Sequence, residues 1–81
     1  MALTGTDLLE QMTQAGIAPE IVARLKSDLP LLKQGVDSVD YPAFVLAVEE
    51  AHGVSISDED SLRLRTLDDF AAHINRMKAS A

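Results

Sequence analysis

The stretch "QGVDSVDYPAFVLAVEEAHGV", residues 34–54, joins a short polar loop to an apolar helix. Phe44, Val45 and Val48 recur at the spacing of one helix face, with Tyr41 one turn earlier. Gly53 is a typical residue just past the end of a helix. The pattern therefore predicts a main helix that buries this stripe and ends at Gly53.

Pro42 indicates where the main helix begins. If Ser38 were the N-cap, the amide of Pro42 should donate the first intrahelical hydrogen bond, but proline has no amide hydrogen. Proline also disfavours helical geometry at the preceding Tyr41. With Asp40 as the cap, Pro42 falls in the first turn, where no donor is needed. We therefore predict a helix that starts close to Tyr41, with Ser38 exposed in the preceding loop.

The residues before this stretch predict two shorter helical pieces and a loop. The first piece has Thr6 as its cap, apolar residues at 8, 9 and 12, and its end at Gly16. The second starts at Pro19 and presents Ile21, Val22 and Leu25 on one face. Residues 27–35, "SDLPLLKQG", are typical of a loop, which we expect to be anchored to the core by Leu29, Leu31 and Leu32.

The residues after it predict two more helices. Ser57 and Asp60 form a pair like a capping box at the start of a short third helix. Thr66 should cap the last helix, whose apolar stripe comprises Leu67, Phe70, Ala71, Ile74 and Met77. Strand patterns are weak throughout. The sequence thus predicts an all-α fold, a small bundle with one long loop before the main helix.

Composition limits the possible functions. The chain has 81 residues, of which 47% are hydrophobic and 25% charged, as expected for one globular domain. We interpret residues 1–81 as a single domain, and the start at Met1 favours a discrete protein. No secretory signal, membrane span or cysteine is present, which favours a cytoplasmic protein. The net charge of −6 and scattered basic residues argue against nucleic-acid binding and suit solubility or basic protein partners.

Catalysis by Ser38 is not supported by the sequence. A serine nucleophile needs a base within hydrogen-bond reach, and His52 would lie roughly 20 Å away along the same helix. His73 cannot be placed, and both histidines are interpreted as ordinary surface or partly buried residues. The acidic runs starting at Asp37 and Asp58 fail the spacing of a calcium loop, so no metal site is predicted.

Local chemistry alone favours a plain capping role for Ser38 over a role as the acceptor of an attached group. Serine is common as a helix N-cap. A serine at the mouth of a helix is also a favourable acceptor for a phosphate-linked group added by another enzyme, because free amides and the helix dipole face the phosphate.

The wider pattern resembles the acyl carrier protein family. "GVDSVDYPAFVLAVEEAHGVSISDED" matches the family's Asp-Ser motif and following helix, "LPLLKQG" its preceding loop, and "LRTLDDFAAHI" its last helix. The resemblance covers roughly residues 29–75, and the first 28 residues match only as helical sequence. It implies a four-helix bundle of acyl-carrier type, with a long loop before the main helix and a short third helix.

The resemblance also implies a function. Ser38 would carry 4′-phosphopantetheine, attached covalently from coenzyme A by a phosphopantetheinyl transferase. Asp37 would help to position the magnesium-bound donor. The arm would hold an acyl-type group as a thioester and present it to acyl- or aminoacyl-loading and processing enzymes, and the carrier itself would not be an enzyme. We expect a monomer that binds neither nucleic acid nor a membrane. The cargo could be fatty acyl, polyketide, aminoacyl or hydroxy-acid.

Partner docking is implied at the start and outer face of the main helix. The corresponding residues are Val39, Asp40, Ala43, Leu46 and Ala47. Two of this helix's residues depart from the family: Ala43 stands where Glu is frequent, and Pro42 replaces a branched apolar residue. Both departures bear on partner identity more than on modification of Ser38. The alternative function is an unmodified, carrier-like helical domain that only binds other proteins.

Overall fold

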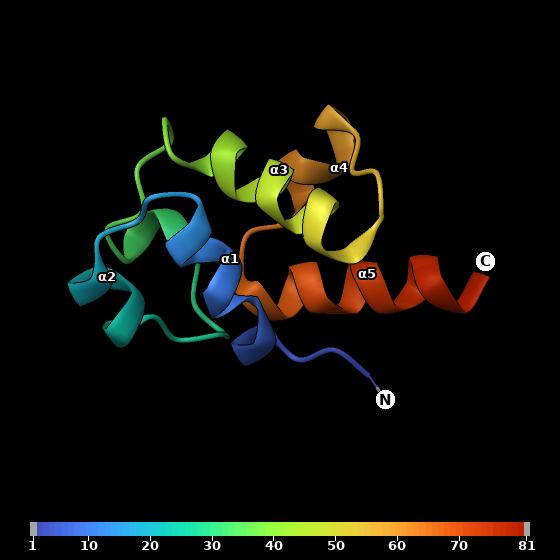
Figure 1. The fold of residues 1–81 in the computed structure, drawn as a ribbon, viewed down its shortest axis with the longest axis horizontal. Coiled ribbons are helices and arrows are strands. Elements are labelled where there is room, and N and C mark those ends of the chain that lie inside the picture. Colours follow the sequence, from blue (N-terminus) through green and yellow to red (C-terminus); the bar gives the residue numbers. More distant parts are fainter. Residues whose placement is uncertain (1, 81) are drawn as a thin grey trace.

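The computed structural model describes residues 2–80, which form five α-helices and two short 3₁₀-helices (Figure 1). In chain order these elements are η1 (Gly5–Leu8), α1 (Leu9–Gln14), α2 (Pro19–Arg24), η2 (Leu31–Lys33), α3 (Tyr41–His52), α4 (Asp58–Arg63) and α5 (Leu67–Ser80). No strand occurs within these residues, which confirms the all-α prediction. Because η1 leads directly into α1, the two act as the first helix of a small acyl-carrier-type bundle with α3, α4 and α5, and α2 lies in the long connection.

The first helix is capped by Thr4, so the prediction of Thr6 was wrong. The Asp7 carboxylate accepts hydrogen bonds from the Thr4 amide at 2.8 Å and the Thr4 hydroxyl at 3.1 Å. These two bonds hold the pKa of the Asp7 carboxyl below its usual value. The helix thus begins one half-turn earlier than its apolar pattern suggested, in a tight 3₁₀ turn.

The connection before α3 is less deeply anchored than predicted. Pro19 starts α2, as expected, but of the three leucines assigned to the core only Leu31 is buried. Leu29 is 43% exposed and Leu32 is 56% exposed, so neither anchors the loop. In the 3₁₀ turn η2, consecutive side chains point in different directions, and only one of them can face the core.

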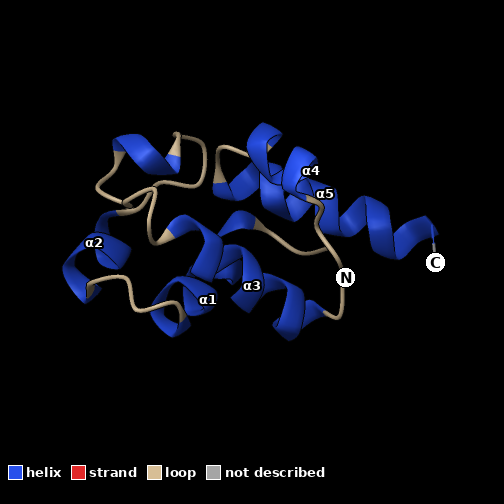
Figure 2. Cartoon of the chain, turned by 90° about the horizontal axis from the view of Figure 1, so that it is seen from above, coloured by secondary structure: helices blue, strands red, loops and turns tan. Residues whose placement is uncertain are grey.

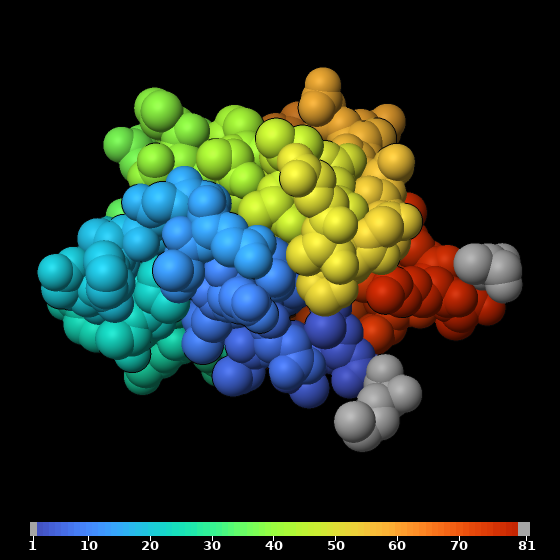
Figure 3. Space-filling view, in the orientation of Figure 1, coloured from blue at the N-terminus to red at the C-terminus, as the bar shows by residue number. Residues whose placement is uncertain are grey.

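The core lies between α3, α5 and the first helix. Phe44 and Val48 of α3 and Phe70 and Ile74 of α5 are buried, as predicted, and Phe44 meets Phe70 edge to face with ring centroids 5.1 Å apart. Figure 2 shows α1 alongside α3, and the space-filling view shows the second half of α3 against α1 (Figure 3). The apolar faces of α3 and α5 are therefore both covered by neighbouring helices.

The predicted ends of the later helices are confirmed. Gly53 ends α3 with a φ of +66°, a left-handed conformation that disfavours other residues. The Ser57 hydroxyl accepts from the Asp60 amide at 3.1 Å at the start of α4. At the start of α5, Thr66 and Asp69 exchange bonds of 3.0 and 3.2 Å between side chain and backbone, which is a full capping box.

None of the helices described is long and apolar enough to cross a bilayer. Across residues 2–80, no three His, Asp or Glu side chains gather closely enough to hold a metal ion.

Candidate functional site

Ser38 lies in a tight turn immediately before α3, and its side chain is exposed. The carbonyl of Asp37 accepts hydrogen bonds from the Asp40 amide at 2.9 Å and the Tyr41 amide at 3.1 Å, which closes the turn around Ser38. Because Pro42 has no amide hydrogen, the Ser38 carbonyl cannot enter the helical ladder four residues on. The regular helix begins at Tyr41, as predicted, and Ser38 lies outside it.

The side chain that organises this turn is Asp37, not Asp40. Asp37 Oδ1 accepts from the Val39 amide at 3.2 Å and lies 3.4 Å from the Ser38 hydroxyl, which donates to it. Asp40 occupies the N-cap position, but its side chain makes no capping hydrogen bond. The expectation that Asp40 caps the helix is therefore correct in position and wrong in mechanism.

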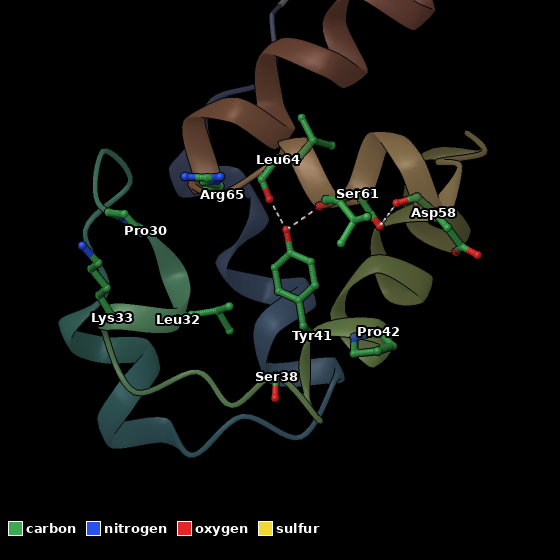
Figure 4. Close-up of a pocket in the computed structure, with 11 residues that line it drawn as sticks. Pro30, Leu32, Lys33, Ser38, Tyr41, Pro42, Asp58, Ser61, Leu64 and Arg65 are labelled. Carbon is green, nitrogen blue, oxygen red and sulfur yellow. Dashed lines mark hydrogen bonds between the residues drawn. The ribbon is translucent and has the colours of Figure 1, made fainter.

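Tyr41 connects the start of α3 to α4. Its hydroxyl donates to the carbonyls of Ser61, at 3.1 Å, and Leu64 (Figure 4). Its ring lies 5.9 Å from that of Phe70, centroid to centroid. Burial, and then the negative charge of Asp69, raise the pKa of Tyr41 to about 12. The helix that follows Ser38 is thus held to the end of α4 by a neutral phenol.

An open groove of ≈ 680 Å³ begins beside Ser38. One side comes from the loop around η2, the other from α4 and the residues that follow it, and the start of α3 lies between them (Figure 4). The floor is mostly apolar, formed by Pro30, Leu32, Tyr41, Pro42, Leu62 and Leu64. Leu32 and Leu62 are exposed large apolar residues, and Leu62 is 79% exposed.

Charged side chains flank the groove. Lys33 lies on the η2 loop, Arg65 lies just after α4 on the other wall, and Asp58 lies at the start of α4, at the far end of that wall from Arg65 (Figure 4). Sequence reasoning missed this groove and its cations. Its walls come from segments about thirty residues apart, and the only local signal was the single tyrosine of the chain, a residue that combines an apolar ring with a polar tip.

The residues predicted to dock partners lie along one side of α3. Val39 is 79% exposed, Leu46 is 54% exposed, Ala43 is exposed, and Asp40 and Ala47 are partly exposed. A second, more polar hollow lies over Ala43, Leu46 and Ala47, between α3 and the end of α1. The structure thus brings these residues onto an accessible surface next to Ser38, but on the side of α3 away from the groove's α4 wall.

The two histidines lie away from Ser38. His52 and His73 are both partly buried, and neither lines the groove. His73 Nε2 is 3.9 Å from Asp60 Oδ2, which connects α5 to α4 rather than to the loop of Ser38. Within the described chain, therefore, Ser38 has no histidine base beside it.

Comparison with known proteins identifies the class. Residues 12–74 match the family model described as "Phosphopantetheine attachment site", and the chain belongs to this family. It is similar to two proteins named acyl carrier protein. One, from Syntrophobacter fumaroxidans, is 37% identical over 83% of this chain and 80% of its own length. The other, from Bdellovibrio bacteriovorus, is 35% identical over 78% of each chain.

The protein is therefore a carrier that holds acyl groups on a covalent 4′-phosphopantetheine arm. The site fits such a group. An exposed hydroxyl stands at the edge of a long apolar groove, outside the helical ladder, and a lysine lies on the same groove. The arm supplies the terminal thiol that a chain without cysteine lacks. The chain's own residues offer an exposed hydroxyl at Ser38, the tight turn that exposes it and an apolar surface beside it.

Proposed function

We propose that Ser38 is the attachment site of the phosphopantetheine arm. The observation that carries this proposal is the position of its exposed hydroxyl, outside the α3 ladder and at the edge of the groove. A transferase can reach such a hydroxyl without unwinding a helix. We further propose that residues 1–81 make up one carrier domain.

Asp37 would act during attachment. Its Oδ1 is occupied by the Val39 amide and the Ser38 hydroxyl, which orients the carboxylate beside the acceptor. The second oxygen, Oδ2, would contact the magnesium-bound coenzyme A donor. Hard divalent cations prefer carboxylate oxygens, and a single carboxylate beside bound phosphates is a common arrangement for magnesium.

The carrier itself would perform no catalysis. A serine nucleophile requires an adjacent general base, and the side-chain neighbour of Ser38 is a carboxylate that accepts from the Val39 amide and from the Ser38 hydroxyl. The partners would be a phosphopantetheinyl transferase and acyl-loading and acyl-processing enzymes. They would dock on Val39, Asp40, Ala43, Leu46 and Ala47, whose exposed apolar side chains are placed beside an acidic residue.

Intact-mass measurement tests the attachment site. The chain is incubated with coenzyme A, magnesium and a phosphopantetheinyl transferase of broad specificity. We expect one added phosphopantetheine in the wild type and in Ser55→Ala, which removes an exposed loop serine elsewhere. Ser38→Ala should remain unmodified. Modification of Ser38→Ala, or an unmodified wild type with several transferases, would contradict the proposal, and the latter would favour a purely protein-binding domain.

A further inference from the structure

We propose that the groove beside Ser38 favours cargo that ends in a carboxylate, which Lys33 and Arg65 hold. The proposal rests on attachment of the arm at Ser38. It narrows the cargo to acyl groups with a second, anionic end, as opposed to acyl groups with a plain alkyl end.

The first observation is the pair of cations. Lys33 and Arg65 are both exposed and both line the groove, Lys33 from the η2 loop and Arg65 from the residues that follow α4 (Figure 4). Among residues 2–80, neither side chain forms an ion pair. The chain has only seven basic residues and a net charge of −6, so two unpaired cations on one groove stand out against the acidic remainder. Arginine in particular presents a donor geometry that matches a carboxylate.

The second observation is the apolar surface between Ser38 and these cations. Leu32 is 56% exposed and Leu62 is 79% exposed, and both line the groove. Tyr41 lies across the groove floor and closes the gap between α3 and α4. A cargo chain would therefore lie on the surface of the groove, where its end remains within reach of exposed charges.

The occupant follows from the tether. A group attached at Ser38 is already on the wall of the groove, and a short flexible linker raises its effective concentration there to the millimolar range. Exposed ion pairs are individually weak. At such a concentration, however, even a weak attraction between the cargo's carboxylate and the two cations raises the fraction of time that the cargo spends in the groove. Asp58, at the other end of the α4 wall from Arg65, would repel a carboxylate and so direct it towards Lys33 and Arg65.

The test compares two cargoes of equal length. The carrier is loaded from hexanoyl- or adipoyl-coenzyme A by the transferase, and intact mass confirms complete loading of Ser38. The rate of thioester cleavage by hydroxylamine is then measured at low salt. Each rate is divided by that of the same acyl group on free pantetheine, which removes differences in intrinsic reactivity. We expect adipoyl to be protected about threefold more than hexanoyl, and the difference to disappear at high salt.

Variants assign the effect to the two cations. In Lys33→Gln/Arg65→Gln the adipoyl advantage should be lost, whereas Lys26→Gln/Lys78→Gln, which also removes two positive charges but outside the groove, should retain it. Equal protection of both cargoes in the wild type would overturn the proposal. So would an equal loss for both cargoes in the double variant, because the cations would then serve the phosphate of the arm. Failure to load any cargo would instead contradict attachment at Ser38.

Discussion

The hydroxyl of Tyr41 donates a hydrogen bond to the carbonyl of Ser61, 3.1 Å away and twenty residues later in the chain. This bond connects the first turn of α3, directly after the candidate attachment site, to α4. Together with the buried residues Ile56 and Leu64 on either side of α4, it positions the α4 wall of the groove.

Replacement of Tyr41 by Phe should lower the free energy of unfolding by about 1–2 kcal/mol, because two carbonyls near the end of α4 lose a donor while the ring stays in place. Urea unfolding measures the change. Tyr41→Leu should cost a further 0.5–1.5 kcal/mol, roughly, through loss of the ring contact with Phe70. If Tyr41→Phe were as stable as the wild type, the hydroxyl would not hold α4.

The same phenol predicts a loss of stability in alkaline solution. The pKa of Tyr41 is raised from 10.0 to about 12, so at intermediate pH the folded protein keeps a proton that the unfolded chain has released. The stabilisation is complete below pH 10 and is lost as the pH rises towards 12. The measurement is the difference in unfolding free energy between wild type and Tyr41→Phe, which isolates the contribution of this phenol. A difference that does not shrink across this range would contradict the prediction.

Phe70 and Leu62 should respond very differently to truncation. Phe70 is fully buried against Phe44 and Tyr41, and Phe70→Ala should cost about 3–5 kcal/mol, a large part of the stability of a small domain. Leu62 is 79% exposed, and Leu62→Ala should change the unfolding free energy by less than about 0.5 kcal/mol. Chemical denaturation followed by circular dichroism compares the two. A large cost for Leu62→Ala would mean that its side chain is covered.

Gly5 should not tolerate a side chain. A Cβ at this position would lie 2.6 Å from Asp68 Oδ1 and 2.9 Å from Ser27 Cβ, so η1, the α2–η2 connection and the start of α5 could not all keep their places. We expect Gly5→Ala to cost about 1–3 kcal/mol in thermal or urea unfolding. In the double variant with Asp68→Ala only part of this cost should be recovered, since Ser27 remains. Full recovery would show that the crowding comes from the Asp68 side chain alone.

Charge reversal at Asp40 tests the docking surface. If basic partners approach the start of α3, Asp40→Lys should slow association with the transferase and flatten its salt dependence. Stability should change little, because the Asp40 side chain makes no capping bond. Stopped-flow or surface-binding rates at low salt provide the measurement, with Glu20→Lys on α2 as the matched control. Equal association rates for wild type and Asp40→Lys would place docking elsewhere.

Sequence reasoning succeeded where the signal lies within one helical turn. The missing amide of Pro42 fixes the start of α3, and Gly53, Ser57 and Thr66 fix helix ends through backbone geometry or short-range capping. It failed at Thr4, because two threonines close together compete for the same cap and the choice depends on Asp7.

The site itself was only partly predictable. Ser38 and its exposure follow from the motif and Pro42, but the groove does not. Whether Leu32 is buried, or whether Tyr41 reaches Ser61, depends on how segments far apart in sequence pack. No local pattern could have distinguished Leu31, which is buried, from Leu29 and Leu32, which are exposed.

Helix α4 contributes no buried residue of its own, and its flanking residues Ile56 and Leu64 are the ones that enter the core. A segment held at both ends and unpacked in between can open by itself, at a free energy well below that of global unfolding. Its backbone amides should therefore exchange with deuterated water sooner than those of α3 and α5. Such local opening would widen the space beside Ser38 and leave the aromatic contacts of the core intact.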